Sequence, residues 1–155
     1  MARSLDRVAA ALAAAGLATE IRRMPASTRT AEEAAAACGC ETARIVKSLI
    51  FAGAESDRLH LLLVSGAHAV DPALAAAAAG EPLARADARR VREETGFAIG
   101  GVAPVGHLAP VATLMDETLL AHASVWAAAG APDAVFEIAP RDLLRLSGAR
   151  AARLA

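Results

Sequence analysis

The spacing of hydrophobic positions changes along this chain, from the period of a helix to the period of a strand. Leu5, Val8 and Leu12 recur at the spacing of one helical face, which predicts a helix that ends at Gly16. Thr30 is followed three residues later by a glutamate, the pattern of a capping box, and this predicts the start of a second helix. Capping residues or prolines begin the other predicted helices, at 71–79, 87–95 and 140–146.

Short apolar runs between these segments predict the strands. The runs at 45–51 and 59–64 are separated by a polar turn with Gly53 and Asp57, so they predict a hairpin at the centre of the sheet. The order of elements lacks the strict βαβ alternation of a dinucleotide fold. It predicts an α/β (α+β) fold, with a mixed sheet flanked by helices, and a single domain over 1–155. Further strands are predicted at 19–24, 111–115, near Val125 and at 134–138.

Composition supports a packed domain and limits the partners that the chain can hold. Of its 155 residues, 55% are hydrophobic and 21% are charged, as is typical of globular proteins. The net charge is −1, from 16 basic and 17 acidic residues, so the chain has no strong positive field and must hold any nucleic acid locally. No apolar run is long enough to predict a membrane-spanning helix.

The amino end superficially imitates a secretory signal, because Arg3 and Arg7 precede an alanine-rich run. Asp6 interrupts this charged region, and the helical face described above favours a mature amphipathic helix. Cys38 and Cys40 are one residue apart, a spacing that fits neither a zinc knuckle nor a redox Cys-x-x-Cys pair. We therefore expect reduced thiols in a cytoplasmic protein with no membrane association.

Lys47 is the only lysine of the chain, and arginine supplies the other basic side chains. Where arginine is so strongly preferred, a surviving lysine indicates a position that arginine cannot fill. In a strand, Lys47 shares a face with Leu49 and Phe51, so its ammonium group lies among apolar neighbours. The residue alone leaves two interpretations open, a functional ammonium group or a packed stem whose charged end reaches water.

The segment 96–106 contains Gly100, Gly101 and Gly106 beside Pro104, which is too much glycine and proline for a regular element. Glycines let backbone N–H groups approach an oxyanion, carboxylate or phosphate, but loops of this composition are more often plain turns. The 4 histidines show no spacing typical of a metal pair, and no Gly-x-Ser-x-Gly motif marks a nucleophilic serine. The sequence therefore predicts no metal site.

Four motifs occur in a specific order and spacing over nearly the whole chain. They are Ser27-Thr28-Arg29-Thr30 before an alanine-rich helix, Arg44-Ile-Val-Lys47-Ser-Leu-Ile-Phe51, Gly96-x-x-x-Gly100-Gly101-x-x-Pro104-x-Gly106 and Ala128-Ala-Gly130. In this combination the sequence resembles the YbaK and prolyl-tRNA editing domain family. The resemblance implies a mixed, partly barrel-like sheet flanked by helices. It also implies an enzyme that hydrolyses the ester between a wrong amino acid and the 3′ end of tRNA.

The resemblance further implies the site residues. In this family mechanism, Lys47 holds a phosphate or carbonyl oxygen of the acceptor end, and backbone amides around Gly100, Gly101 and Gly106 fix the ester. A hydroxyl of the terminal ribose helps to activate water, with no metal or other cofactor. Some relatives carry a polar residue after the last motif, where this chain has Ala131-Pro132, so that contact is not carried over. The implied substrate-binding residues are Ser27, Thr28, Thr30, Ser48, Pro104, Gly106 and Gly130.

The expected partner is the acceptor end of an aminoacyl-tRNA, with or without a synthetase that presents it, and we expect a monomer or a homodimer. The resemblance implies tRNA for proline carrying a small amino acid, and the apolar residues near Ala128 favour Ala or Cys over Ser. The sequence alone leaves two other functional classes open. One is a non-catalytic module that binds an aminoacyl or nucleotide ligand in the same pocket. The other is an enzyme that forms a Schiff base through Lys47.

Overall fold

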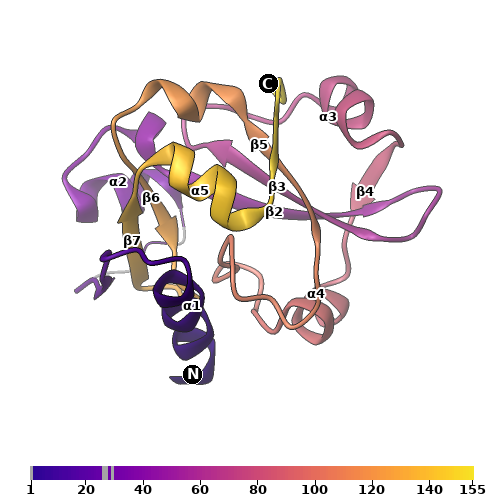
Figure 1. Cartoon of the computed structure of the whole chain (residues 1–155). Coiled ribbons are helices and arrows are strands. Elements are labelled where there is room, and N and C mark those ends of the chain that lie inside the picture. Colours follow the sequence, from indigo (N-terminus) through magenta and orange to yellow (C-terminus); the bar gives the residue numbers. More distant parts are fainter. Residues whose placement is uncertain (1, 26–27, 29) are drawn as a thin grey trace.

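The computed structural model describes residues 2–25, 28 and 30–155, in which helices and strands are interspersed (Figure 1). The fold class predicted from the sequence, mixed α/β, is confirmed. The helices are α1 (Ala2–Ala14), α2 (Ala31–Cys38), α3 (Pro72–Ala79), α4 (Ala88–Thr95) and α5 (Pro140–Ser147), with short 3-10 helices at Thr42–Arg44 and Glu117–Ala121. The strands are β1 (Ile21–Arg23), β2 (Val46–Gly53), β3 (Leu59–Ser65), β4 (Leu83–Arg85), β5 (Ala112–Asp116), β6 (Val125–Ala128), β7 (Ala134–Ile138) and β8 (Arg150–Ala152).

The strands form two sheets instead of the one sheet expected. The larger sheet has the order β4-β2-β3-β5-β8, in which β2 is antiparallel to β3 and β4, while β5 is parallel to β3 and β8. The smaller sheet, β1-β7-β6, is antiparallel. A single bridge between Ile45 and Trp126 connects β6 to the residue before β2. The predicted hairpin of β2 and β3 is therefore present, and β1, near the amino end, pairs with β7 in the smaller sheet.

β3 lies at the centre of the core because both of its faces are covered. Leu61 and Leu63 pack in the cluster that contains Phe97, whereas Leu62 packs on the opposite face with Ala75 of α3. All three leucines are 0% exposed. A strand that is buried on both faces shows a continuous apolar run instead of alternation, which explains the pattern that predicted it.

One edge of β2 is only partly covered, and this opening positions the site. β4 pairs with the end of β2, at 51–53, and the bridge to Trp126 lies at Ile45. Between these two points, no strand of the described residues pairs with the edge of β2 that faces away from β3. The backbone of β2 from Lys47 to Ile50 therefore has no strand partner on that side.

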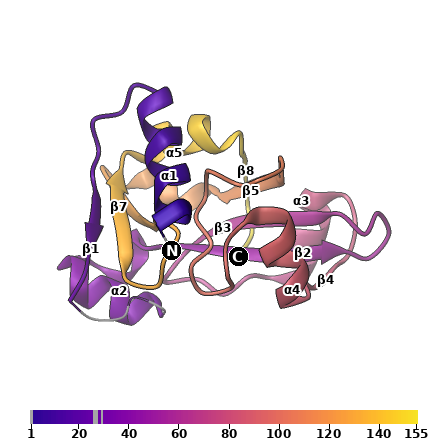
Figure 2. The ribbon, with the colours of Figure 1, turned by 90° about the horizontal axis from the view of Figure 1, so that it is seen from below.

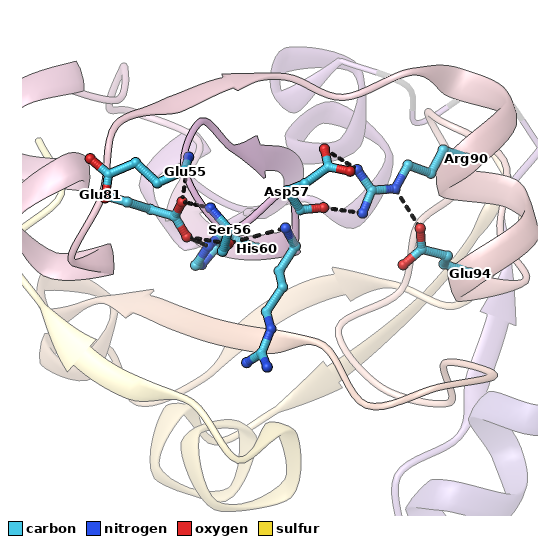
Figure 3. A network of polar contacts seen from close by, with 8 residues as sticks. Glu55, Ser56, Asp57, His60, Glu81, Arg90 and Glu94 are labelled. Atoms are coloured by element: carbon cyan, nitrogen blue, oxygen red, sulfur yellow. Dashed lines mark hydrogen bonds and ion pairs between the residues drawn. The ribbon is translucent and has the colours of Figure 1, made fainter.

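A polar network fixes the turn between β2 and β3 (Figure 3). The Glu81 carboxylate accepts hydrogen bonds from the N–H and the hydroxyl of Ser56, at 2.8 and 2.6 Å, and lies 2.9 Å from His60 Nε2. The hydrogen bonds from Ser56, followed by the one from His60, lower the pKa of Glu81 to about 2. Arg90 of α4 forms an ion pair with Asp57 at the tip of the turn, 3.0 Å apart. The turn is thus tied both to the segment after α3 and to α4.

Candidate active site

A cavity of about 490 Å³ lies along the open edge of β2. It brings together Lys47, Ser48, Thr28, Thr30 and Gly100, which are far apart in the sequence. Strand β2 contributes six consecutive residues, and the rest of the lining comes from the segment before α2, the end of β4, loop 96–106 and β6. The lining residues are Thr28, Thr30, Ala31, Ile45, Val46, Lys47, Ser48, Leu49, Ile50, Phe51, Arg85, Ala86, Ile99, Gly100, Val102 and Ala128.

Lys47 is half-buried, and a backbone group holds its ammonium end. Nζ donates a hydrogen bond to the carbonyl oxygen of His68, in the turn that follows β3. Among the ion pairs formed by the described residues, none includes Lys47. A neutral carbonyl does not cancel the positive charge, so the ammonium group keeps its attraction for an anionic or carbonyl oxygen.

Asp116 anchors the turn that carries this carbonyl. Its carboxylate is 2% exposed, lies 2.9 Å from His68 Nδ1 and accepts a hydrogen bond from the Ser65 N–H at 3.3 Å. The N–H and hydroxyl of Thr118 donate to the same carboxylate. Burial of Asp116 acts to raise its pKa, but these hydrogen bonds outweigh burial and leave the pKa below its usual value. The sequence analysis missed this anchor, because His68 and Asp116 are 48 residues apart and belong to no motif.

Ser48 has a hydroxyl group without a partner. Its Oγ is buried, and no donor or acceptor of the described residues lies within hydrogen-bonding distance. A buried hydroxyl that lacks its hydrogen bond costs about 1–3 kcal/mol of stability. Ser48 therefore makes no hydrogen bond for the fold through its hydroxyl, and although the residue lines the cavity, its Oγ is covered by neighbouring atoms.

A small apolar pit of about 40 Å³ adjoins the main cavity. The two spaces share Thr28, Ile45, Val46, Gly100 and Ala128. The single side-chain hydroxyl in the lining of the pit, that of Thr28, donates its proton to the Pro132 carbonyl. The pit is therefore a small, weakly polar space that opens beside the wall formed by Gly100. Its other lining residues are Ala34, Trp126, Ala127, Ala131 and Val135.

The structure separates the glycines of loop 96–106. Gly100 lines both spaces, has a φ of +92° and leaves open space where a Cβ would stand. Gly101 is buried against the Ala131 backbone, and its N–H donates to the Ala98 carbonyl at 2.9 Å. The Gly101 amide is therefore committed within the loop, and of the predicted pair only Gly100 lines the cavity. A glycine at position 100 suits close approach by a ligand.

Pro104, Gly106 and Gly130 lie outside the lining of the cavity. Gly106 and Gly130 have positive φ values, of +82° and +102°, and both pack against α1. A Cβ on Gly106 would lie 3.1 Å from the carbonyl carbon of Arg7, and one on Gly130 would lie 3.1 Å from the carbonyl oxygen of Ser4. These glycines permit close packing of the helix, which the sequence pattern could not distinguish from ligand binding. Pro104 is buried in the same loop.

The predicted capping box is present, which fixes one wall of the cavity. The Thr30 hydroxyl accepts from the Glu33 N–H at 3.0 Å, and the Glu33 carboxylate accepts from the Thr30 N–H at 3.2 Å. Ser27, the remaining predicted site residue, lies outside the described residues. Burial raises the pKa of the Cys38 thiol to about 11, so this cysteine is not a reactive thiolate.

The described residues contain neither a metal-binding cluster nor a membrane-spanning helix. No group of three His, Cys, Asp or Glu side chains is arranged there to hold a metal ion. No helix in the described part of the chain combines the length and the apolar character needed to cross a membrane.

Comparison with known proteins identifies the family. The sequence model of the aminoacyl-tRNA editing domain family matches residues 25–146 of this chain. A crystal structure described as a candidate trans-editing enzyme for prolyl tRNA synthetase is 48% identical, has a TM-score of 0.90 and covers 97% of this chain and 96% of its own. The crystal structure of hypothetical protein APE2540 is 31% identical, with a TM-score of 0.87 and coverage of 96% and 98%.

YwhH of Bacillus subtilis (strain 168), described as uncharacterized, is 30% identical over 128 residues, which are 83% of this chain and 81% of YwhH. The resemblance found in the motifs is thus confirmed by comparisons that cover most of the chain, and the fold agrees with that of the relatives. The chain belongs to the aminoacyl-tRNA editing domain family.

Proposed function

We propose that this protein is a trans-editing deacylase, which hydrolyses the ester between a small amino acid and the 3′ end of a mischarged tRNA. The observation that carries the proposal is the cavity along β2. There Lys47, whose ammonium group has no carboxylate partner among the described residues, lines one space with Gly100, and an apolar pit adjoins it. Ester hydrolysis needs donors for a developing oxyanion and a place for the amino-acid side chain, and this cavity offers both.

In this proposal, Lys47 binds a phosphate or the carbonyl oxygen of the ester, and the N–H of Gly100 contributes to holding the ester. Charge-assisted hydrogen bonds of this kind are about twice as strong as neutral ones. Gly100 takes the role alone, because the N–H of Gly101 is bonded to Ala98. Ser48 also lines the cavity, and its buried, unpaired hydroxyl supplies a further hydrogen bond once the bound substrate displaces the atoms that cover it.

The reaction needs only water and the ester. Water attacks the carbonyl carbon and forms a new C–O bond, the bond from that carbon to the ribose oxygen breaks, and the proton lost by water ends on that ribose oxygen. The products are the free amino acid and tRNA with a free 3′ end. The described lining contains no His, Asp, Glu or Cys, so we assign the activation of water to the neighbouring ribose hydroxyl. The proposal includes no metal or cofactor.

The adjoining pit supports a choice of amino acid. A volume of about 40 Å³ with a mostly apolar lining suits the side chain of Ala or Cys, and the proton of the Thr28 hydroxyl in this lining is already donated to Pro132. The pyrrolidine ring of proline is larger than these side chains, so the pit selects against the cognate amino acid by size. The choice of tRNA for proline is supported by the relative described as a candidate trans-editing enzyme for prolyl tRNA synthetase.

The hold on tRNA is local in this proposal. The net charge of −1 provides no general attraction for a polyanion. Arg85, exposed at the end of β4, lines the cavity and is placed for a phosphate of the acceptor end. A synthetase that presents the tRNA is compatible with this limited contact, and the activity belongs in the cytoplasm, where charged tRNA is used.

A panel of charged tRNAs tests the proposal. Purified protein is mixed with tRNA for proline carrying Ala, Cys, Ser or Pro, and the ester that remains is measured over time against a protein-free control. We expect rapid loss of Ala and Cys and no loss of Pro. Ser is expected to react more slowly, by about tenfold, because the mostly apolar lining of the pit compensates its hydroxyl poorly for the loss of water. If the protein hydrolysed only a different mischarged tRNA, the proposed deacylase activity would stand and the proposed substrate would be wrong. Binding of charged tRNA without hydrolysis of any ester would indicate a non-catalytic module.

A further inference from the structure

We infer that Arg7, in the amino-terminal helix α1, is a positioning residue for the loop that carries Gly100. The inference rests on the proposed function, in which this loop holds the ester. Arg7 Nε donates to the Gly106 carbonyl at 3.0 Å, and Nη2 donates to the Gly96 carbonyl at 2.7 Å. These two carbonyls lie at the two ends of loop 96–106. One planar guanidinium group therefore closes the loop at both ends.

The surroundings of Arg7 show that its charge serves this loop. The guanidinium carbon lies 4.9 Å from the centroid of the Phe97 ring, which is 1% exposed, so the group also stacks on a buried loop residue. Among the ion pairs of the described residues, none includes Arg7. An arginine that donates to two carbonyls and covers a ring is held in one geometry, since its fork of donors is rigid.

The backbone of α1 fits the same loop. Gly106 and Gly130 approach the carbonyl groups of Arg7 and Ser4 so closely that a Cβ on either glycine would lie about 3 Å from the helix. Figure 1 and Figure 2, seen from two directions, both place α1 beside the loop that runs from α4 to β5. The helix lies outside residues 25–146, the part that matches the family model. Loop 96–106 contains no helix or strand, so contacts such as this packing contribute to its shape.

Loss of the clamp therefore changes the position of Gly100 without removing a group that touches the substrate. Misplacement of a catalytic group by about 1 Å can cost about 100-fold in rate. For Arg7→Met, which keeps an unbranched apolar stem, we expect kcat to fall by tenfold to 100-fold. The KM for tRNA is expected to change by less than about twofold, because Arg7 does not line the cavity. Arg7→Lys keeps the charge but can reach only one carbonyl, so an intermediate kcat is expected.

The test combines kinetics with hydrogen exchange. The three proteins compared with the native chain are Arg7→Met, Arg7→Lys and the control Arg150→Met, in which the replaced guanidinium also donates to a backbone carbonyl, that of Ala78, away from the cavity. In Arg7→Met we expect faster exchange of amides in 96–106, unchanged exchange in β3 and the loss in kcat. Arg150→Met is expected to keep the native kcat.

Native kcat and native exchange of loop 96–106 in Arg7→Met would overturn the inference. So would equal losses in both Arg7 variants that simply follow a fall in Tm. If the native protein cleaves no ester, the proposed function fails, and the exchange of loop 96–106 alone still decides whether Arg7 holds the loop.

Discussion

At the scale of single residues, Ser48 allows the effect of a side chain on stability to be distinguished from its effect on catalysis. Its hydroxyl is buried without a partner among the described residues, whereas the hydroxyl of Ser124 donates to Glu137 at 2.7 Å. Removal of an unpaired polar group costs no hydrogen bond, but removal of a paired one costs about 1 kcal/mol. The two serines therefore form a matched pair for mutation.

We predict that Ser48→Ala keeps or raises Tm and lowers the deacylation kcat by about tenfold, which corresponds to one lost hydrogen bond of about 1.4 kcal/mol in the transition state. Ser124→Ala should lower Tm and leave kcat close to that of the native protein. Thermal unfolding and single-turnover deacylation measure the two properties. A Ser48→Ala protein with reduced Tm and native kcat would show that the hydroxyl serves only the fold.

At the scale of elements, the sequence predicted the long, strongly patterned segments well. The five helices and the β2–β3 hairpin lie close to the predicted ranges. It missed β4 and β8, each of which has three residues. Strands this short form because they pair with the edges of a sheet that is already present, and their own residues carry little preference. The division into two sheets escaped prediction for the same reason, since pairing partners are not encoded locally.

The site was predictable in part for a related reason. Lys47 and Gly100 stand in motifs and both line the cavity, whereas Gly106 and Gly130 carry the same glycine signal and pack against α1 instead. A glycine pattern indicates a backbone that is approached closely, but it does not distinguish approach by a ligand from approach by another part of the chain. The Asp116 anchor and the Arg7 clamp join residues remote in the sequence, so no local pattern revealed them.

The turn after β3 gives the prediction at this scale. Asp116→Asn weakens the bonds that hold the turn and thereby moves the His68 carbonyl that binds Lys47. We expect a loss of about 1–3 kcal/mol in stability, typical of hydrogen bonds to charged groups, together with a fall in kcat of tenfold or more. Urea unfolding and deacylation at pH 7 measure the two effects. A protein that loses stability but keeps its native kcat would exclude a role for the turn in placing Lys47.

At the scale of the whole molecule, the network around Glu81 links stability to pH. Hydrogen bonds from Ser56 and His60 lower the pKa of Glu81 from 4.5 to about 2. Because the folded pKa is the lower one, the stabilisation is complete above about pH 4.5 and is lost as the pH falls towards 2. Glu81 ties the turn and the first part of β3 to the segment before β4, whereas the Arg90–Asp57 pair, which does not include Glu81, ties the turn to α4 (Figure 3).

We predict that Glu81→Gln lowers Tm at pH 7 and that the difference from the native protein shrinks between pH 4.5 and 2. Glu93→Gln, at an exposed ion pair on α4, serves as the control and should show a small difference over the whole range. Thermal unfolding monitored by circular dichroism at several pH values provides the data. A difference for Glu81→Gln that stays constant down to pH 2 would contradict the assigned pKa.

The most direct test of the account is the single-turnover deacylation rate of the native protein and of Lys47→Arg on the same tRNA for proline charged with alanine. Arginine keeps the charge, but its planar guanidinium group is larger and cannot replace a compact ammonium group bound to the His68 carbonyl. The account predicts that the native protein cleaves the ester well above the uncatalysed rate. It also predicts that Lys47→Arg loses about 90% of the rate or more, which corresponds to at least about 1.4 kcal/mol, with an unchanged circular dichroism spectrum and Tm. Equal rates for the two proteins would contradict it.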